Sequence, residues 1–123
     1  MSGRILIVED ERVIREVQAE YLMSQGYEVV VAESGAQALL ILNGPEADFA
    51  VAVVDWQMAG VNGRAVFDLI RSRFPKTQVV ISTGRTSAEL PEQIVHRLGG
   101  KLLRKPFSLK TLGVEVERQL LEG

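Results

Sequence analysis

Five polar side chains with reactive chemistry directly follow apolar stretches of the sequence. They are three carboxylates, a hydroxyl and an ammonium, at Glu9, Asp10, Asp55, Thr83 and Lys105. If these groups converge in the fold, the carboxylates repel one another, and the pKa of at least one of them should rise. A hard divalent cation removes that repulsion. Mg²⁺ commonly takes one or two carboxylates, several waters and a phosphate oxygen, so the set indicates a magnesium site.

Asp55 stands where a nucleophile would be expected, because it ends the apolar run from Phe49 to Val54. A carboxylate held beside a metal ion can attack phosphorus and form an aspartyl phosphate. The metal and the Lys105 ammonium would then share the phosphoryl oxygens. Neutralising that charge does most of the catalytic work in phosphoryl transfer.

Each feature also has an ordinary explanation when it is taken singly. The acidic run Glu9–Glu11 is more typical of a helix start, where the helix dipole favours carboxylates. Lys105-Pro106 fits a turn, and Thr83-Gly84 fits a strand exit. His96 is the only histidine and has no second ligand near it in the sequence, so a surface position is expected. The glycines form neither a G-x-G-x-x-G nor a P-loop pattern, which leaves nucleotide binding through such a loop unsupported.

Two kinds of sequence pattern alternate along the chain and predict the elements that position these groups. Five short apolar runs, mostly β-branched and continuous, predict strands covered on both faces. The runs are Ile5–Val8, Val29–Ala32, Phe49–Val54, Val79–Ile81 and Leu102–Leu103. The last run is the weakest, because charged residues flank only two leucines.

Segments with helical spacing follow each of these runs. The first two helices are marked by Val13, Val17 and Tyr21, ending near Gly26, and by a cap at Ser34, ending near Asn43. The other three are marked by Val66, Leu69 and Ile70 before Pro75, by Leu90, Ile94, Val95 and Leu98 with Pro91 in the first turn, and by Leu109, Leu112, Val116 and Leu120 after a cap at Ser108.

Strand and helix thus alternate five times, which predicts an α/β fold with a parallel sheet and helices on both faces. Ligands in such folds bind outside the carboxyl ends of the strands. All five polar residues stand at those ends, so the fold should gather them at one edge of the sheet.

Four motifs in this order resemble the receiver domain of the response regulators of bacterial two-component systems. The motifs are ILIVED (Ile5–Asp10), DWQMAGVNG (Asp55–Gly63), STG (Ser82–Gly84) and KPF (Lys105–Phe107). The resemblance treats residues 1–123 as a single receiver domain. It implies a flavodoxin-like, doubly wound (βα)5 three-layer sandwich with a five-stranded parallel sheet of order 2-1-3-4-5.

The resemblance also assigns roles to single residues. Asp55 is the phosphoacceptor, which takes a phosphoryl group from the phosphohistidine of a histidine kinase or a phosphotransfer domain in a Mg²⁺-dependent reaction. The other assignments are Asp10 as a direct metal ligand, Glu9 as a ligand through water, the Gln57 backbone carbonyl as a further ligand, Thr83 and Lys105 as partners of the phosphoryl group, and Pro106 as a cis proline. Such a domain catalyses its own phosphorylation and slow dephosphorylation and is not a metabolic enzyme.

Two positions depart from the family pattern. Ala59 replaces the usual proline of the motif that follows the acceptor. Leu102 stands three residues before Lys105, where the family usually has a Phe or Tyr that turns inward when the threonine moves. The switch pair here is therefore Thr83 and Leu102. The output face implied by the resemblance is formed by the fourth helix, fifth strand and fifth helix, and Leu102 is expected near it as part of a standing contact patch.

Two other classes of function stay open. A phosphorylation-independent protein-interaction module would keep the fold and lose the switch, which Leu102 favours. A flavodoxin-like cofactor domain is opposed by the acidic set and by the lack of a phosphate-cradling loop.

Composition limits the partners and the surroundings. The chain has 123 residues, a formal charge of −2 and no cysteine, so it lacks the basic footprint for nucleic acid, a disulfide framework and a thiolate metal site. Neither a signal peptide nor an apolar run long enough for a bilayer is present, which predicts a cytoplasmic domain without membrane contact. With no effector segment after the fifth predicted helix, we expect a stand-alone receiver or the receiver part of a hybrid histidine kinase or longer regulator.

Overall fold

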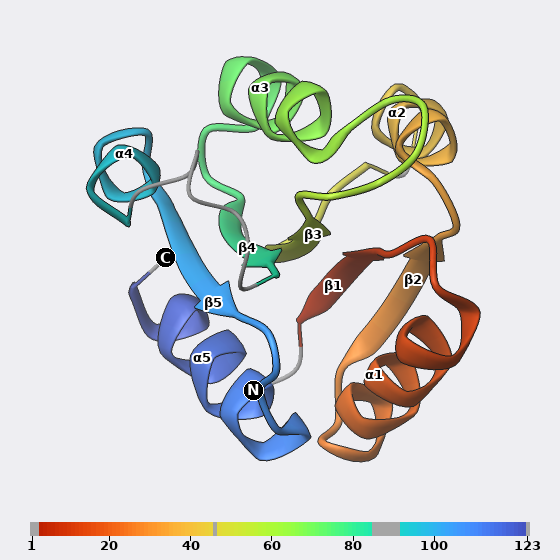
Figure 1. Ribbon diagram of the computed structural model, residues 1–123, viewed down its shortest axis with the longest axis vertical. Helices are drawn as coiled ribbons and strands as arrows, with labels where there is room; N and C mark the ends of the chain where they lie inside the picture. The colour runs from red at the N-terminus through yellow and green to blue at the C-terminus, as the bar shows by residue number, and fades with distance from the viewer. Residues whose placement is uncertain (1–2, 46, 85–91, 123) are drawn as a thin grey trace.

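The computed structural model describes residues 3–45, 47–84 and 92–122, and strands and helices alternate strictly along them (Figure 1). The strands are β1 (Arg4–Val8), β2 (Glu28–Ala32), β3 (Val51–Asp55), β4 (Gln78–Thr83) and β5 (Gly100–Arg104). The helices are α1 (Arg12–Ser24), α2 (Gly35–Leu42), α3 (Gly63–Arg73), α4 (Glu92–Arg97) and α5 (Leu109–Glu122). Each of the predicted strands and helices is present.

The strands form one sheet in the order β2-β1-β3-β4-β5, with every neighbouring pair parallel. This confirms the expected flavodoxin-like topology. In Figure 1, α1 and α5 cover one face of the sheet, and α2, α3 and α4 cover the other. The result is the predicted three-layer sandwich.

Two hydrophobic cores, one on each face, explain why the strand sequences are continuously apolar. Successive strand side chains point to opposite faces. In β1, Ile5 and Ile7 pack in the core under α1 and α5, while Leu6 and Val8 pack in the core under α2, α3 and α4. A strand buried on both sides needs apolar residues at every position. The apolar run of β5 is short because β5 is an edge strand with polar residues at both ends.

The predicted caps of two helices are present. The Ser34 hydroxyl accepts a hydrogen bond from Gln37 N at 3.1 Å and begins α2, and the Ser108 hydroxyl accepts one from Thr111 N at 3.0 Å and begins α5. α1 ends at Ser24, shortly before Gly26, which takes a positive φ of 98°. That backbone conformation suits glycine and stops the helix. Leu90 and Pro91, the expected start of the fourth helix, lie outside the described residues.

Two of the three residues that marked the first helix, Val13 and Val17, do not form its buried face, whereas Tyr21 packs against the core under α1 and α5. The side chains that pack on the sheet are Arg15, Gln18, Ala19 and Leu22. Val13 is 72% exposed and Val17 is 42% exposed. The stripe predicts the helix correctly because its spacing is helical, yet it lies at the rim of the sheet. There it faces the loop between β5 and α5. In the described part of the chain, no helix combines the length and the hydropathy that crossing a bilayer requires.

Candidate functional site

The carboxyl ends of the strands bring the five predicted side chains to one edge of the sheet. Val8 is level with Val54, and Asp55 is level with Ser82 in the parallel register. Glu9 and Asp10 follow β1, Asp55 ends β3, Thr83 ends β4 and Lys105 follows β5. The convergence expected from the sequence is therefore observed.

The three carboxylates lie together. Glu9, Asp10 and Asp55 each offer an oxygen within 4.8 Å of the others. Glu9 and Asp55 are buried, whereas Asp10 is exposed. Such a group has one side closed by protein and one side open, as a site for a hydrated ion requires.

Backbone N–H groups fix the orientation of each carboxylate. Glu11 N donates to Glu9 Oε2 at 3.1 Å, and Gln57 N donates to Asp55 Oδ1 at 3.2 Å. Ala59 N donates to Asp10 Oδ2 at 3.3 Å. The residue that replaces the family's proline thus supplies a donor that proline lacks, and it ties the β3–α3 loop to the acidic cluster.

Lys105 supplies the positive charge. Its Nζ lies 3.2 Å from Glu9 Oε1 and 3.5 Å from Asp55 Oδ1. Burial alone would lower the pKa of Lys105, but the charges of Asp55 and Glu9 outweigh burial and raise that pKa. The lysine is therefore a firmly held cation. The Lys105–Pro106 peptide bond is cis, and Lys105 N donates to Thr83 O at 2.7 Å.

One ammonium does not neutralise the cluster. Burial, and then the charge of Asp55, raise the pKa of Glu9 to about 7, although a hydrogen bond from Glu11 N acts in the opposite direction. The Glu9 carboxylate is therefore poorly solvated as an anion, mainly because it is buried, and the nearby Asp55 carboxylate adds to that cost. A divalent cation would supply the missing positive charge.

Thr83 contributes a hydroxyl with an unused capacity. Its side chain is fully buried, and in the described residues its Oγ1 has no hydrogen-bond partner. A buried polar atom without a partner costs free energy of about 1–3 kcal/mol. A phosphoryl oxygen beside Asp55 would give this hydroxyl an acceptor. Together with an all-oxygen set of carboxylates, the unpaired Thr83 hydroxyl fits a site for a hard cation and a phosphoryl group.

Two contacts near the site were not found from the sequence. The Gln57 side-chain oxygen accepts from Gly84 N at 2.9 Å and joins the loops after β3 and β4. Arg15 lies behind the cluster, where its Nη1 donates to the backbone oxygen of Glu9 at 3.0 Å. Neither contact can be recognised in the sequence, because glutamine and arginine ordinarily lie on a protein surface.

Gly63, which ends the second motif, is required there for a steric reason. A Cβ at Gly63 would lie 2.5 Å from Asp55 O and 2.7 Å from Trp56 Cα. The chain must therefore pass close behind the acceptor strand at this point, which only glycine allows.

The expectation for Leu102 is wrong in one respect. Leu102 is 8% exposed and packs in the core under α2, α3 and α4, so it is not part of an exposed contact patch. Its place in β5 directs the side chain inward, and a leucine is short enough to be enclosed there. His96 is exposed on α4, as expected.

An apolar groove of about 480 Å³ lies beside the acidic cluster, between α1 and the loop before α5. Its apolar lining comes from Val13, Ile14, Val17, Pro106, Phe107 and Leu109, with Lys105 at one end. The exposed valines of α1, Val13 and Val17, therefore line a groove next to the site.

A doubly wound parallel sheet with an acidic cluster, a lysine and a threonine at its carboxyl edge is the arrangement that the sequence resemblance implied. A sequence model described as the response regulator receiver domain matches residues 5–117. The chain belongs to that family, the receiver domain of two-component response regulators.

Individual relatives agree with this assignment. The chain is 31% identical over 121 residues to the response regulator protein FleR of Pseudomonas aeruginosa, covering 98% of this chain and 25% of that protein. It is 29% identical to the sensor kinase CckA of Brucella abortus, covering 97% of this chain and 13% of that protein. The solved receiver domain of the Francisella response regulator 1452 is 25% identical, with a TM-score of 0.85 and 98% of each chain covered. The chain spans about a quarter or less of these curated relatives.

Proposed function

We propose that Asp55 accepts a phosphoryl group from the phosphohistidine of a histidine kinase or a phosphotransfer domain. The observation that carries this proposal is the environment of Asp55. The carboxylate is buried, lies 3.5 Å from the Lys105 ammonium and shares the sheet edge with a threonine hydroxyl that has no other partner among the described residues. Each of these groups has a use when a phosphoryl group is attached to Asp55.

In the transfer, an Asp55 oxygen forms a bond to phosphorus while the bond between phosphorus and the donor nitrogen breaks. The imidazole leaves with the electron pair and takes up a proton. Lys105 holds positive charge against the incoming phosphoryl oxygens, and Thr83 donates its hydroxyl hydrogen to one of them. Attack by water on the same phosphorus later returns the carboxylate and releases phosphate.

The residues that would hold Mg²⁺ are Asp10, Asp55 and the Gln57 backbone carbonyl, with Glu9 bound through water. Bound there, the ion would neutralise the carboxylates and the phosphoryl oxygens. The raised pKa of Glu9 and the closeness of the three carboxylates support this set.

We also propose a docking surface for the donor. The groove beside the site is apolar and adjoins Lys105, so a helix presenting a phosphohistidine could bury its side chains against α1 and the loop before α5. The output partner is proposed to bind α4, β5 and α5, of which β5 is the edge strand of the sheet opposite to β2 (Figure 1). No nucleic acid or membrane is proposed as a ligand.

The proposed setting is the cytoplasm, with residues 1–123 acting as one regulatory domain. Relatives in which the matching part is a quarter or less of the protein support a longer parent, either a regulator or a hybrid kinase. The interaction-only alternative is less well supported, because a domain that had lost phosphorylation would not need the buried carboxylates and the held lysine.

The test is the intact mass of the protein after incubation with a small phosphodonor, with and without Mg²⁺. The wild type should gain one phosphoryl group only when Mg²⁺ is present, and Asp55→Asn should gain none. Asp68→Asn is the matched control, because Asp68 is an exposed aspartate on α3 that pairs with Arg64. Label that remains in Asp55→Asn, or that appears on His96, would contradict the proposal.

A further inference from the structure

The outer edge of β2 carries backbone groups that the fold does not use. Within residues 3–45, 47–84 and 92–122, β2 is an edge strand and pairs only with β1. Glu28 N donates to Gly3 O, and Ala32 O accepts from Glu9 N, so the groups of Glu28, Val30 and Ala32 face β1. Because this direction alternates along a strand, the N–H and C=O groups of Val29 and Val31 face away from the sheet.

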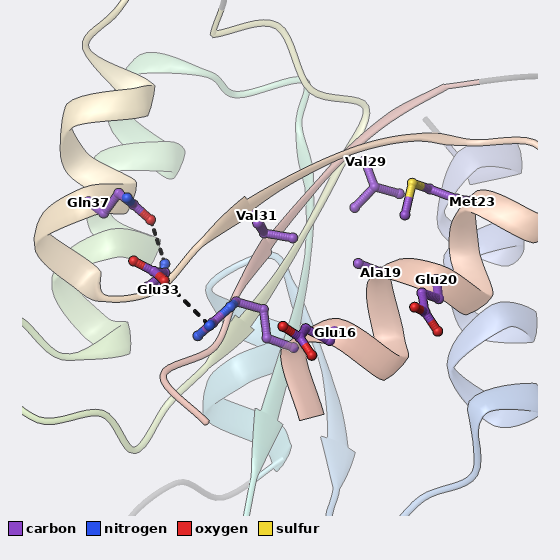
Figure 2. A pocket seen from close by; sticks show the side chains of 9 residues that line it. Glu16, Ala19, Glu20, Met23, Val29, Val31, Glu33 and Gln37 are labelled. Carbon is purple, nitrogen blue, oxygen red and sulfur yellow. Dashed lines mark hydrogen bonds and ion pairs between the residues drawn. The ribbon is translucent and has the colours of Figure 1, made fainter. Parts of the chain in front are cut away.

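A groove of about 640 Å³ lies along this edge, between α1 and the start of α2 (Figure 2). Its floor is apolar and includes Val29, Val31, Ala19 and Met23. Val31 is 38% exposed and Met23 is 50% exposed. The free backbone edge therefore adjoins an apolar surface that remains open to solvent.

The rim of the groove is acidic. Glu16, Glu20 and Glu33 line it together with one cation, Arg15, and Glu16 also pairs with Arg12 at 3.0 Å. Arg15 is turned to the protein, because it donates to the Glu9 backbone and lies 3.5 Å from Glu33. Glu20 is exposed and has no ion pair in the part of the chain that the structure describes. The groove thus offers a carboxylate that can receive a cation from outside.

Three features coincide here: unpaired strand groups, an apolar floor and an acidic rim. We propose that β2 accepts an extended, lysine- or arginine-containing segment of a partner protein as an additional strand of the sheet. Main-chain hydrogen bonds to Val29 and Val31 supply the pairing, as in other cases of strand addition. A lysine or arginine of the added segment, on the side that faces α1, lays its aliphatic stem over Val31 and Met23 and brings its charge to Glu20.

Other occupants fit less well. A second copy of the chain paired through β2 would bring its own Glu16, Glu20 and Glu33 to the same groove. The two acidic rims would then repel each other. An acidic segment would meet the same repulsion. The edge lies at the far side of the sheet from β5, so the proposed surface is distinct from the proposed output face (Figure 1). It does not depend on phosphorylation of Asp55.

The test uses an alternating Lys-Thr peptide of about ten residues, long enough to cover a five-residue strand. Amide hydrogen exchange of the chain is measured by NMR with and without the peptide at about 1 mM, a concentration that detects weak binding. We expect the amides of Val29 and Val31 to exchange at least about tenfold more slowly with the peptide. Glu20→Lys should remove this protection. Glu117→Lys, an exposed glutamate on α5, is the matched control and should keep it.

Two control peptides separate pairing from charge. The same peptide with every backbone amide methylated should give no protection, and neither should a Glu-Thr peptide. Unchanged exchange at Val29 and Val31 with the Lys-Thr peptide would overturn the proposal, as would equal protection by the Glu-Thr peptide. Protection that grows with protein concentration alone would show a second copy as the occupant and would also overturn it. Asp55→Asn should respond to the peptide as the wild type does, which keeps this result separate from the phosphoacceptor proposal.

Discussion

The Nζ atom of Lys105 lies 3.5 Å from Oδ1 of Asp55, and the two residues come from the loop after β5 and the end of β3. The same ammonium also contacts Glu9 at 3.2 Å. One cation therefore faces two buried carboxylates, and its position relative to both decides how the site responds to a change in charge.

The first prediction separates charge from placement at Lys105. Lys105→Arg keeps the positive charge, but a planar guanidinium cannot occupy the position of a compact ammonium between two carboxylates. We expect the variant to fold and to bind Mg²⁺, yet to show little conformational response to phosphorylation. The measurement is the change in the amide chemical shifts of Thr83 and Gly84, which adjoin the site, on phosphorylation. A wild-type response would show that charge alone is sufficient.

The second prediction concerns the pH dependence of stability without metal. The pKa of Glu9 is raised from 4.5 to about 7, so between these values the folded protein binds more protons than the unfolded chain. This contribution to the free energy of unfolding is complete below pH 4.5 and is lost as the pH rises to 7.

The measurement is denaturant unfolding in a chelator across that range, comparing wild type with Glu9→Gln. As the pH rises across that range, the free energy of unfolding of the wild type should fall by about 1 kcal/mol relative to that of Glu9→Gln. The effect is modest because the site is partly open to water. Mg²⁺ should reverse the trend. A difference that does not vary with pH would show that Glu9 titrates normally.

The third prediction addresses the metal ligands. Mg²⁺ should raise the melting temperature of the wild type by mass action and change the fluorescence of Trp56, which adjoins the acceptor. Asp10→Ala should lose both effects. Glu11→Ala is the matched control, because Glu11 is the exposed third acid of the same run and should keep both. If Asp10→Ala responds like wild type, the proposed ligand set is wrong.

The parts that could be predicted from the sequence depend on patterns in which neighbouring residues carry the information. Continuous apolar runs identified the strands because each strand is buried on two faces, and strand-end positions located Glu9, Asp55 and Lys105. Contacts between distant surface-type residues left no such pattern. Arg15 behind the cluster and the Gln57–Gly84 hydrogen bond depend on how loops approach each other in space.

The exposed stripe of α1 shows the same limit in another form. Val13 and Val17 have the spacing of a buried face, and sequence alone cannot distinguish a core from a groove. Only the position of α1 at the rim of the sheet shows that these valines line an open surface.

The fourth prediction tests the groove as the docking surface for the donor. Val17→Glu places a charge in an apolar groove at an already exposed position, so the fold should be retained. Phosphotransfer from a phosphorylated histidine kinase should slow by about tenfold or more, because burying an unpaired charge costs at least about 1.4 kcal/mol. Phosphorylation by a small phosphodonor should be unchanged. Leu40→Glu, at an exposed position on α2, is the matched control. Equal rates of phosphotransfer in the two variants would show that the donor docks at another surface.

The last prediction concerns output. Thr83 can move its hydroxyl toward a phosphoryl oxygen, but Leu102 already lies inside the core and has no ring to withdraw from the face of α4, β5 and α5. Phosphorylation can shift an equilibrium only as far as the two states differ in affinity for the phosphoryl group or the partner. With no large side chain that changes position, the two states differ little at that face. We therefore expect small amide shifts from Val95 to Leu120 on adding a phosphoryl mimic with Mg²⁺, and a modest change in partner affinity.

The comparison that isolates the cause is Leu102→Tyr, which restores the ring that the family usually has. The larger side chain should overpack the core, at a cost of about 1–3 kcal/mol, and this cost favours a conformation in which the ring points outward. Phosphorylation should then move the ring, so the shifts over residues 95–120 should be larger in the variant than in the wild type. Large shifts in the wild type, with a tenfold or greater change in partner affinity (about 1.4 kcal/mol), would show that Thr83 alone drives the switch.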